Sequence, residues 1–271
     1  MMHGALTLLR HSLGGLRGLL LALAAVVALF QTLLVRVARA LEASAGFGGV
    51  AALVPPFLRQ LAGEALFSLL SFPGIVCLGY FHPMIIAALC GMVIAAATEP
   101  AAEIETRFLD AALSRPVPRQ AIIARSVAIV LLLPAVLLAA MLAGTAVGLR
   151  WLAPPGARLP DVRLLASLAA NLWALLVCVG GWALAVGAAS RRRSVAGSIA
   201  GVATLVLFLL DYLARAWKPA DAIAWLSPFH YYRAMELLLG RPLDLSHLAV
   251  LLAAGAAGMV VAAVVFERRD L

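Results

Sequence analysis

The chain has 271 residues, of which 64% are hydrophobic and 13% charged, and its mean hydropathy is +1.04. Soluble domains are roughly half apolar, so this composition excludes an ordinary soluble domain and indicates a membrane protein. The formal net charge of +8 does not indicate a nucleic-acid-binding protein, because the arginines stand at the ends of apolar runs and no basic stripe with interleaved aromatic residues occurs.

Six apolar runs are long enough to cross a bilayer, for which a helix needs about 20 residues. In chain order they cover approximately 16–35, 75–97, 122–142, 164–189, 195–213 and 248–266, and the apolar character of the third continues toward Leu149. Because only helices satisfy their own backbone groups in this way, we expect an all-α protein with six transmembrane helices. Residues 1–271 are expected to form one transmembrane domain.

The first run resembles a cleavable signal peptide, because Arg10 and Arg17 precede it and Ala38, Arg39 and Ala40 follow it. Its apolar length exceeds the usual 7–15 residues of a signal peptide, so an uncleaved span is favoured. After this run, the prolines at 55 and 56 precede the stretch FLRQLAGEALFSLLSF, which is expected to form an amphipathic helix leading into the second span.

The second run ends before a charged segment, EIETRFLDAALSRPVPRQ, which covers residues 103–120. At 3.6 residues per turn its apolar and charged residues fall on opposite faces, so it is expected to form an amphipathic helix in water. Proline at position 116 then ends the helix, because the residue before a proline avoids the helical region. The apolar face would carry Ile104, Phe108, Leu109, Ala112 and Leu113, and the polar face Glu103, Thr106, Arg107, Asp110 and Ser114.

The distribution of arginines predicts the orientation of the chain. Three adjacent arginines, Arg191 to Arg193, separate the fourth and fifth runs and are expected to form a tight turn in water, because arginine is costly at bilayer depth. With the N-terminus, the 98–121 segment, this turn and the C-terminus on one side, about 11 of the 21 basic residues fall within roughly 50 residues. We therefore expect both termini to face the cytoplasm.

The segment between the fifth and sixth runs is long enough to fold. Ser227 is a plausible helix cap with Pro228 at the first position, and Gly240 followed by Pro242 is typical of a helix end. Tyrosines favour the headgroup zone, so a helix lying in the outer membrane interface is expected. Its candidate residues are Ser227, Pro228, Tyr231, Tyr232, Arg233 and Glu236.

Several kinds of membrane chemistry find no signature in the sequence. A coupled carrier usually needs ionisable groups near the span centres, and the histidines and acidic residues stand near the span ends instead. A phosphate-binding loop needs a lysine after a glycine-rich turn, and the only lysine is Lys218. The cysteines at 77, 90 and 178 lie in or beside apolar runs without metal-ligand spacing and are interpreted as apolar filler. Glycines at 144 and 148, and at 197 and 201, are spaced for close helix packing, within the chain or in a dimer.

Three stretches, YFHPMIIAAL, EIETRFLDAALSRPVPR and LSPFHYYRAMELLLGRPLD, together with the tail FERRDL, resemble the permease subunits of ABC-2 type transporters. In that family a version of Glu-x-Glu-x-Gly-Thr-Leu, then Leu-Leu and Arg-Pro-Val-x-Arg, lies between the second and third spans. Thr106 and Arg107 stand here in place of the Gly-Thr. The matching positions are Glu103, Glu105, Leu109, Leu113, Arg115, Pro116, Val117 and Arg119.

The resemblance implies a non-catalytic exporter subunit in a bacterial inner membrane, paired with a second permease copy or homologue. Two copies of a separate ATPase would bind the ATP and magnesium, and this chain would hold no cofactor. An accessory or periplasmic subunit is a further implied partner. The helix after the second span would be the coupling helix, with contacts through Glu103, Glu105, Arg107, Phe108, Asp110, Leu113, Arg115, Pro116 and Arg119.

The resemblance also implies an interfacial helix before the first span, for which LTLLRHSLGGLRG is the candidate, and makes the segment before the sixth span an outer lid. Two alternatives stay open. One is a membrane scaffold or assembly subunit that moves no substrate, and the other is a secondary carrier. The sequence does not identify the substrate.

Overall fold

The computed structural model describes residues 2–53, 68–106 and 119–268, and the side chains of residues 17–43, 68–106 and 121–268. All regular secondary structure in these ranges is helical, and six helical segments are long and apolar enough to cross a membrane. The prediction of an all-α chain with six spans is confirmed. The segments are Arg17–Ala43, Phe72–Ala97, Ala121–Leu152, Val162–Ala189, Arg193–Ala214 and Leu245–Glu267.

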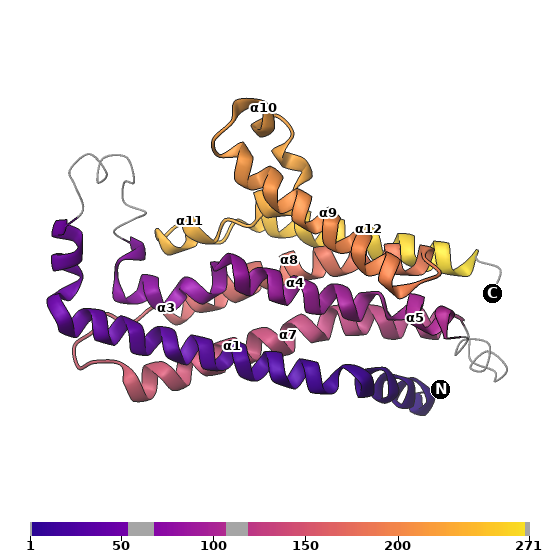
Figure 1. The fold of residues 1–271 in the computed structure, drawn as a ribbon, viewed down its shortest axis with the longest axis horizontal. Helices are drawn as coiled ribbons and strands as arrows, with labels where there is room; N and C mark the ends of the chain where they lie inside the picture. Colours follow the sequence, from indigo (N-terminus) through magenta and orange to yellow (C-terminus); the bar gives the residue numbers. More distant parts are fainter. Residues whose placement is uncertain (1, 54–67, 107–118, 269–271) are drawn as a thin grey trace.

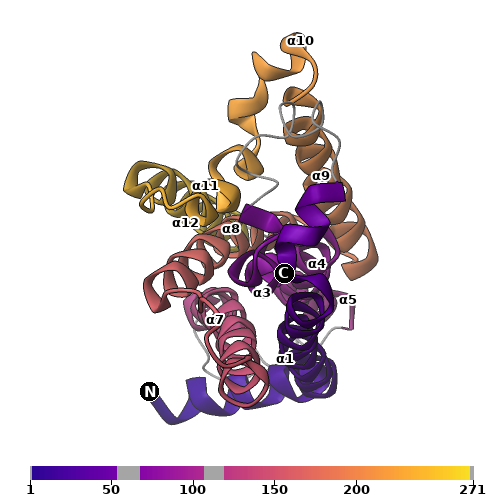
Figure 2. The same cartoon turned by 90° about the vertical axis from the view of Figure 1, so that its left-hand side faces the viewer.

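The helices form an elongated bundle with α8 (Val162–Ala189) near its centre (Figures 1 and 2). On one flank α1 (Met2–Leu53) packs along α7 (Arg119–Leu152), and on the other α12 (Leu245–Glu267) packs along α8. The start of α1, the end of α12 and the short helix α5 lie at the same end of the bundle (Figure 1). This arrangement is the one that an even number of crossings requires.

Glycines bring the helix backbones close together. A Cβ added at Gly181 of α8 would clash with the carbonyl of Gly255 in α12, and a Cβ at Gly258 would lie 2.6 Å from the carbonyl carbon of Gly181. Gly144 and Gly148 of α7 pack in the same way against α1. The close packing predicted at Gly144 and Gly148 therefore occurs within the chain.

The first helix is longer than the sequence predicted. α1 has 52 residues, a length of about 78 Å at 1.5 Å per residue, so it extends far beyond a hydrocarbon layer of about 30 Å. The segment predicted to form a separate interfacial helix before the first span is the beginning of α1 itself. The amphipathic helix predicted after the prolines at 55 and 56 falls mostly on residues 54–67, outside the described residues.

The second span is broken near its middle into α3 (Phe72–Phe81) and α4 (Pro83–Ala97). His82 stands between them with φ −68° and ψ 124°, because a residue before proline avoids the helical region and Pro83 has no N–H to donate. The expectation that the histidines stand at span ends is therefore wrong for His82. The break leaves carbonyls without helical donors, and the Tyr232 hydroxyl donates to the Tyr80 carbonyl at 2.6 Å.

One polar side chain in the first span is buried without a hydrogen-bond partner among the described residues. Gln31 of α1 is fully buried against Gly79 of α3, and within the described residues neither its Oε1 nor its Nε2 makes a hydrogen bond. A buried polar group without a partner costs about 1–3 kcal/mol. We expect Gln31→Leu to raise the free energy of unfolding by about that amount.

Unfolding of the Gln31→Leu variant in mixed detergent micelles measures this change in free energy. Gln31→Glu is the control with the opposite expected sign, because it places a charge at the same buried position and should destabilise the fold. A Gln31→Leu protein less stable than the wild type would show that the amide does have a partner and would refute the prediction.

Candidate functional site

The candidate site is built around α5 (Glu99–Glu105), which follows α4 after a single residue. Thr98 ends α4, with its hydroxyl donating to the Ile94 carbonyl at 2.9 Å, and Pro100 lies in the first turn of α5, where its missing N–H is not needed. α5 ends at Glu105, so it shares only residues 103–105 with the helix predicted from Glu103 onward. The part of that helix predicted after Thr106 lies outside the described residues.

A buried ion pair ties α5 to α7. One guanidinium nitrogen of Arg125, Nη2, lies 2.7 Å from Oε1 and 2.8 Å from Oε2 of Glu103. The Arg125 and Glu103 side chains are 2% and 10% exposed. The expectation that Glu103 lies on a solvated face is therefore wrong. Its carboxylate points into the bundle because the start of the third span supplies a buried cation.

A second set of contacts ties α5 to α9 (Arg193–Ala214). The Arg193 guanidinium lies 3.2 Å from the Glu99 carboxylate and donates to the Ala95 carbonyl at 3.1 Å. The backbone N–H of the same residue donates to Oε2 of Glu105 at 2.9 Å. Because Arg193 is the first residue of α9, the Glu105 carboxylate satisfies one of the free N–H groups at that helix start, where the helix dipole favours negative charge.

The environment of Glu99 disfavours its charged form. Burial raises the pKa of the Glu99 carboxyl above its usual range, the Arg193 guanidinium opposes this rise, and the nearby Glu103 carboxylate adds to it. Two arginines contact the three carboxylates of α5. Of these contacts, the ion pair of Arg125 with Glu103 is the most deeply buried. The contacts join one short helix to the starts of the third and fifth spans.

The site is close to α8 as well. A Cβ added at Gly187 of α8 would lie 3.1 Å from the Ala97 carbonyl oxygen and 3.2 Å from the Thr98 Cα, so α8 passes directly beside the junction of α4 and α5. The turn between α8 and α9 covers residues 190–192, which confirms the predicted tight turn, and its residues Arg191 and Arg192 are exposed.

Only some of the remaining residues predicted to form the coupling helix fall within the described part of the chain. Ile104 is half-buried against the hydrophobic core, which agrees with its predicted place on the apolar face. Arg119 begins α7, but its side chain is not described. The other predicted contacts, Arg107, Phe108, Asp110, Leu113, Arg115 and Pro116, lie outside the described residues.

At the opposite end of α9 the segment between the fifth and sixth spans folds differently from the prediction. Ser227 caps a 3-10 turn, η2 (Pro228–Tyr231), by accepting from the Phe229 N–H at 3.1 Å, as predicted. The chain then breaks at Tyr232 and resumes as α11 (Ala234–Leu238), which Gly240 follows with φ +84°. The single helix predicted over 228–239 is therefore wrong.

The break has a physical cause in the burial of Tyr232. Its side chain turns into the bundle, where its hydroxyl reaches the Tyr80 carbonyl at the end of α3, so it faces the interior of the protein rather than its surface. Tyr231 instead donates to the Trp225 carbonyl at 3.1 Å, and its ring lies against His247 of α12. Arg233 pairs with Glu236 at 3.1 Å on the exposed side.

Comparison with protein-family models and with curated proteins finds no match for this chain.

Proposed function

We propose that this chain is the membrane-spanning permease subunit of an ABC-2 type, ATP-driven exporter, and that α5 is its coupling helix. The observation that supports this most is the set of contacts through which α5 holds two spans at once, Glu103 with Arg125 on α7 and Glu99 and Glu105 with Arg193 on α9. A partner that pushes on α5 would displace both spans, because ion pairs and a hydrogen bond join this helix to each of them.

The location of α5 agrees with this role. It lies at the end of the bundle that also holds the start of α1 and the end of α12 (Figure 1). Its Glu105 contacts Arg193, which directly follows the exposed Arg191 and Arg192 in the chain. The motif that resembles the ABC-2 family continues directly from α5 into residues 107–118. The proposed complex contains two copies of a separate ATPase, which hold the ATP and magnesium, and a second permease copy or homologue. The proposed location is the inner membrane of a bacterium.

Copurification with an ABC ATPase, sought first among the reading frames that adjoin this gene, tests the proposal. We expect the two proteins to form a complex, and we expect ATP hydrolysis only when the ATPase is present. Hydrolysis by this chain alone would contradict the proposal. A complex whose spans do not respond to ATP would support the alternative of a membrane scaffold.

The proposed orientation makes a separate prediction. Cysteines placed at Arg192 and at Arg268 should react with a membrane-impermeant thiol reagent only from the cytoplasmic side, and cysteines at Ala153 and Trp217 only from the outside. The three native cysteines are buried and give little background. Labelling of the cysteine at position 192 from outside whole cells would overturn the orientation.

A further inference from the structure

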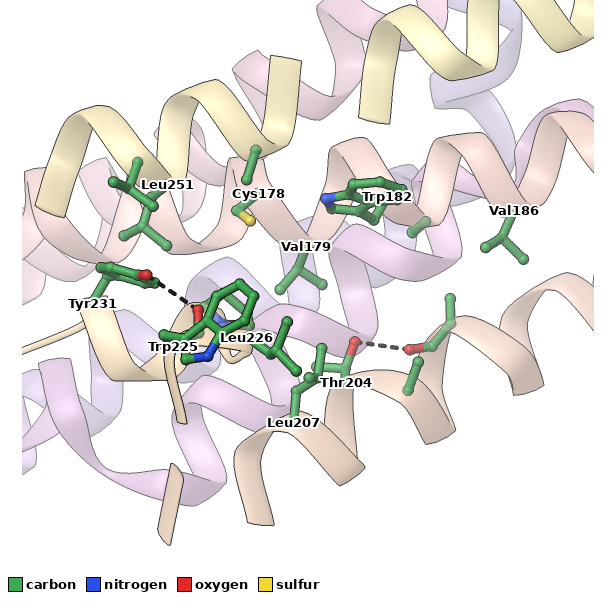
Figure 3. Close-up of a pocket in the computed structure, with 16 residues that line it drawn as sticks. Cys178, Val179, Trp182, Val186, Thr204, Leu207, Trp225, Leu226, Tyr231 and Leu251 are labelled. Atoms are coloured by element: carbon green, nitrogen blue, oxygen red, sulfur yellow. Dashed lines mark hydrogen bonds between the residues drawn. The ribbon is translucent and has the colours of Figure 1, made fainter. Parts of the chain in front are cut away.

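Two apolar cavities lie beside the helix α9. On one side a cavity of about 390 Å³ lies between α4 and α9, and on the other a cavity of about 530 Å³ lies among α8, α9, α12 and the turns η1 (Ala224–Leu226) and η2. Figure 3 shows the second cavity, with Trp182 and Val186 of α8 on one wall and Thr204 and Leu207 of α9 on another. We call it the α8–α9–α12 cavity.

The lining of the α8–α9–α12 cavity is mostly apolar, and its side-chain hydroxyl groups already donate hydrogen bonds to backbone carbonyls. The Thr204 hydroxyl donates to the Ala200 carbonyl at 2.8 Å, and the Tyr231 hydroxyl donates to the Trp225 carbonyl at 3.1 Å (Figure 3). Its lining contains no Asp, Glu, Lys, Arg or His among the described residues. A polar ligand would find few free partners there, whereas a hydrocarbon would leave no hydrogen bond unmade.

The two cavities differ in whether they adjoin a region lined by charged side chains. The α4–α9 cavity shares Pro83, Ile86, Phe208 and Phe229 with a third cavity, of about 500 Å³, whose lining includes charged residues such as Asp211 and Arg215. Water and ions can therefore approach from that side. The α8–α9–α12 cavity shares none of these four residues and is covered by η1 and η2.

Most of the cavity lining belongs to candidate membrane spans. Its walls come from residues 178–186, 200–207 and 250–254, all within three of the segments long and apolar enough to cross a membrane. Along α8 the lining covers about 12 Å at 1.5 Å per residue. Its volume is more than three times the roughly 150 Å³ of an apolar cavity that binds benzene. An empty space of this size would forfeit the dispersion contacts of its lining.

The surroundings of the cavity indicate what fills it. Trp182 and Trp225 line it and are 48% and 60% exposed, so the cavity opens to the face of the bundle that the hydrocarbon layer surrounds. Trp225 and Tyr231 lie together at one end, where η1 and η2 cover it, and such aromatic side chains favour the headgroup level. We propose that the α8–α9–α12 cavity binds one acyl chain of a membrane lipid, which holds α9 against α8 and α12.

This inference does not depend on the proposed function. It is tested with the full-length chain in phosphatidylcholine and phosphatidylglycerol vesicles that contain a phosphatidylcholine with a diazirine in the middle of one acyl chain. After irradiation, we expect peptides from the cavity walls of α8, α9 and α12 to carry the label. A parallel sample with a diazirine fatty acid of the same length separates a lipid from a free fatty acid.

Variants that fill the cavity with a larger side chain, each paired with a control at a neighbouring position, test whether the label enters the cavity. Ala254→Phe on α12 and Ala203→Phe on α9 place a ring in the cavity, whereas Ala253→Phe and Val202→Phe place it one residue away, on exposed positions that do not line it. We expect labelling of the cavity walls to be lost in the first two and kept in the last two. Circular dichroism and elution volume show that each variant folds, and the α9 variant gives an independent reading if Ala254→Phe does not.

Three results would overturn the inference. Equal labelling in the filled variants and their controls would show that the label reports only lipid around the bundle. Labelling of the walls by the fatty acid alone would exclude a membrane lipid as the source. Unlabelled walls, with crosslinks joining the α9 helices of two copies, would assign the cavity to a second copy of this chain.

Discussion

The Arg125→Met variant is expected to lose about 3–5 kcal/mol of folding free energy, because it leaves the Glu103 carboxylate buried without its cation. Solvent cannot replace the guanidinium, since the Glu103 side chain is only 10% exposed. Unfolding in mixed micelles with a rising fraction of denaturing detergent measures the change. Arg150→Met is the matched control, because it makes the same substitution on the same helix at an exposed position, and it should change stability by no more than about 0.5 kcal/mol.

A double variant separates the buried charge from the lost contact. Glu103→Leu combined with Arg125→Met removes both charges, so most of the stability lost in Arg125→Met should return. Single effects that simply add in the double variant would show that the two side chains act independently and would contradict the buried pair.

The six spans are predictable because an apolar run is a local property of the sequence, and a bilayer requires such runs to be helical. The break at His82 also has a local signal, since the residue before a proline avoids the helical region. That signal is hidden in the sequence by the apolar run that continues across it from Ile75 to Ala97. Hydropathy finds the span but not its interruption.

The ion pairs around α5 have only an indirect signal. Glu103 and Arg125 are 22 residues apart in the sequence and lie on different helices, so helical periodicity does not predict their contact. An arginine inside an apolar run does require a partner, so Arg125 in the third span indicates a buried acidic residue without saying which one. Arg193 gives even less, because three adjacent arginines do not show which of them turns toward α5.

The position of Tyr232 has no signal in the sequence. A tyrosine near the end of an apolar run favours the headgroup zone, and that preference predicts an interfacial helix. In the structure a tertiary contact outweighs it, because the broken second span offers the Tyr80 carbonyl as an acceptor inside the bundle. The donor and the acceptor are 152 residues apart.

The burial of Glu103 decides how coupling can be tested. Reversing its charge would break the pair with Arg125 and damage the fold, so a loss of ATPase docking in that variant would have two explanations. The Glu99 and Arg193 side chains are 20% and 39% exposed, and a pair of this exposure contributes at most about 1 kcal/mol to stability. Substitutions there leave the fold in place and change the link between α5 and α9.

In the proposed complex, the Arg193→Gln variant should therefore keep the ATPase bound but lose the response of α9 to ATP. The substitution removes the guanidinium contacts with Glu99 and with the Ala95 carbonyl, whereas the backbone N–H remains bonded to Glu105, so α9 still begins at the same residue. A coupling free energy of 1–3 kcal/mol corresponds to about 5–150-fold, and we expect the ATP response to fall by a factor in this range. The response is the ATP-dependent change in the labelling rate of Ser198→Cys, an exposed position on α9.

Arg192→Gln is the matched control for this experiment, because it removes one positive charge from an exposed neighbour for which no contact with α5 is seen in the described residues. Glu99→Gln should reproduce the loss from the other side of the pair. If α5 acts on α9 through this pair, Arg193→Gln and Glu99→Gln lose the ATP response together while copurification of the ATPase stays at the wild-type level. A wild-type response in both variants would show that α5 does not move α9 through Arg193, and the buried contact with α7 would remain as the route by which α5 reaches the spans.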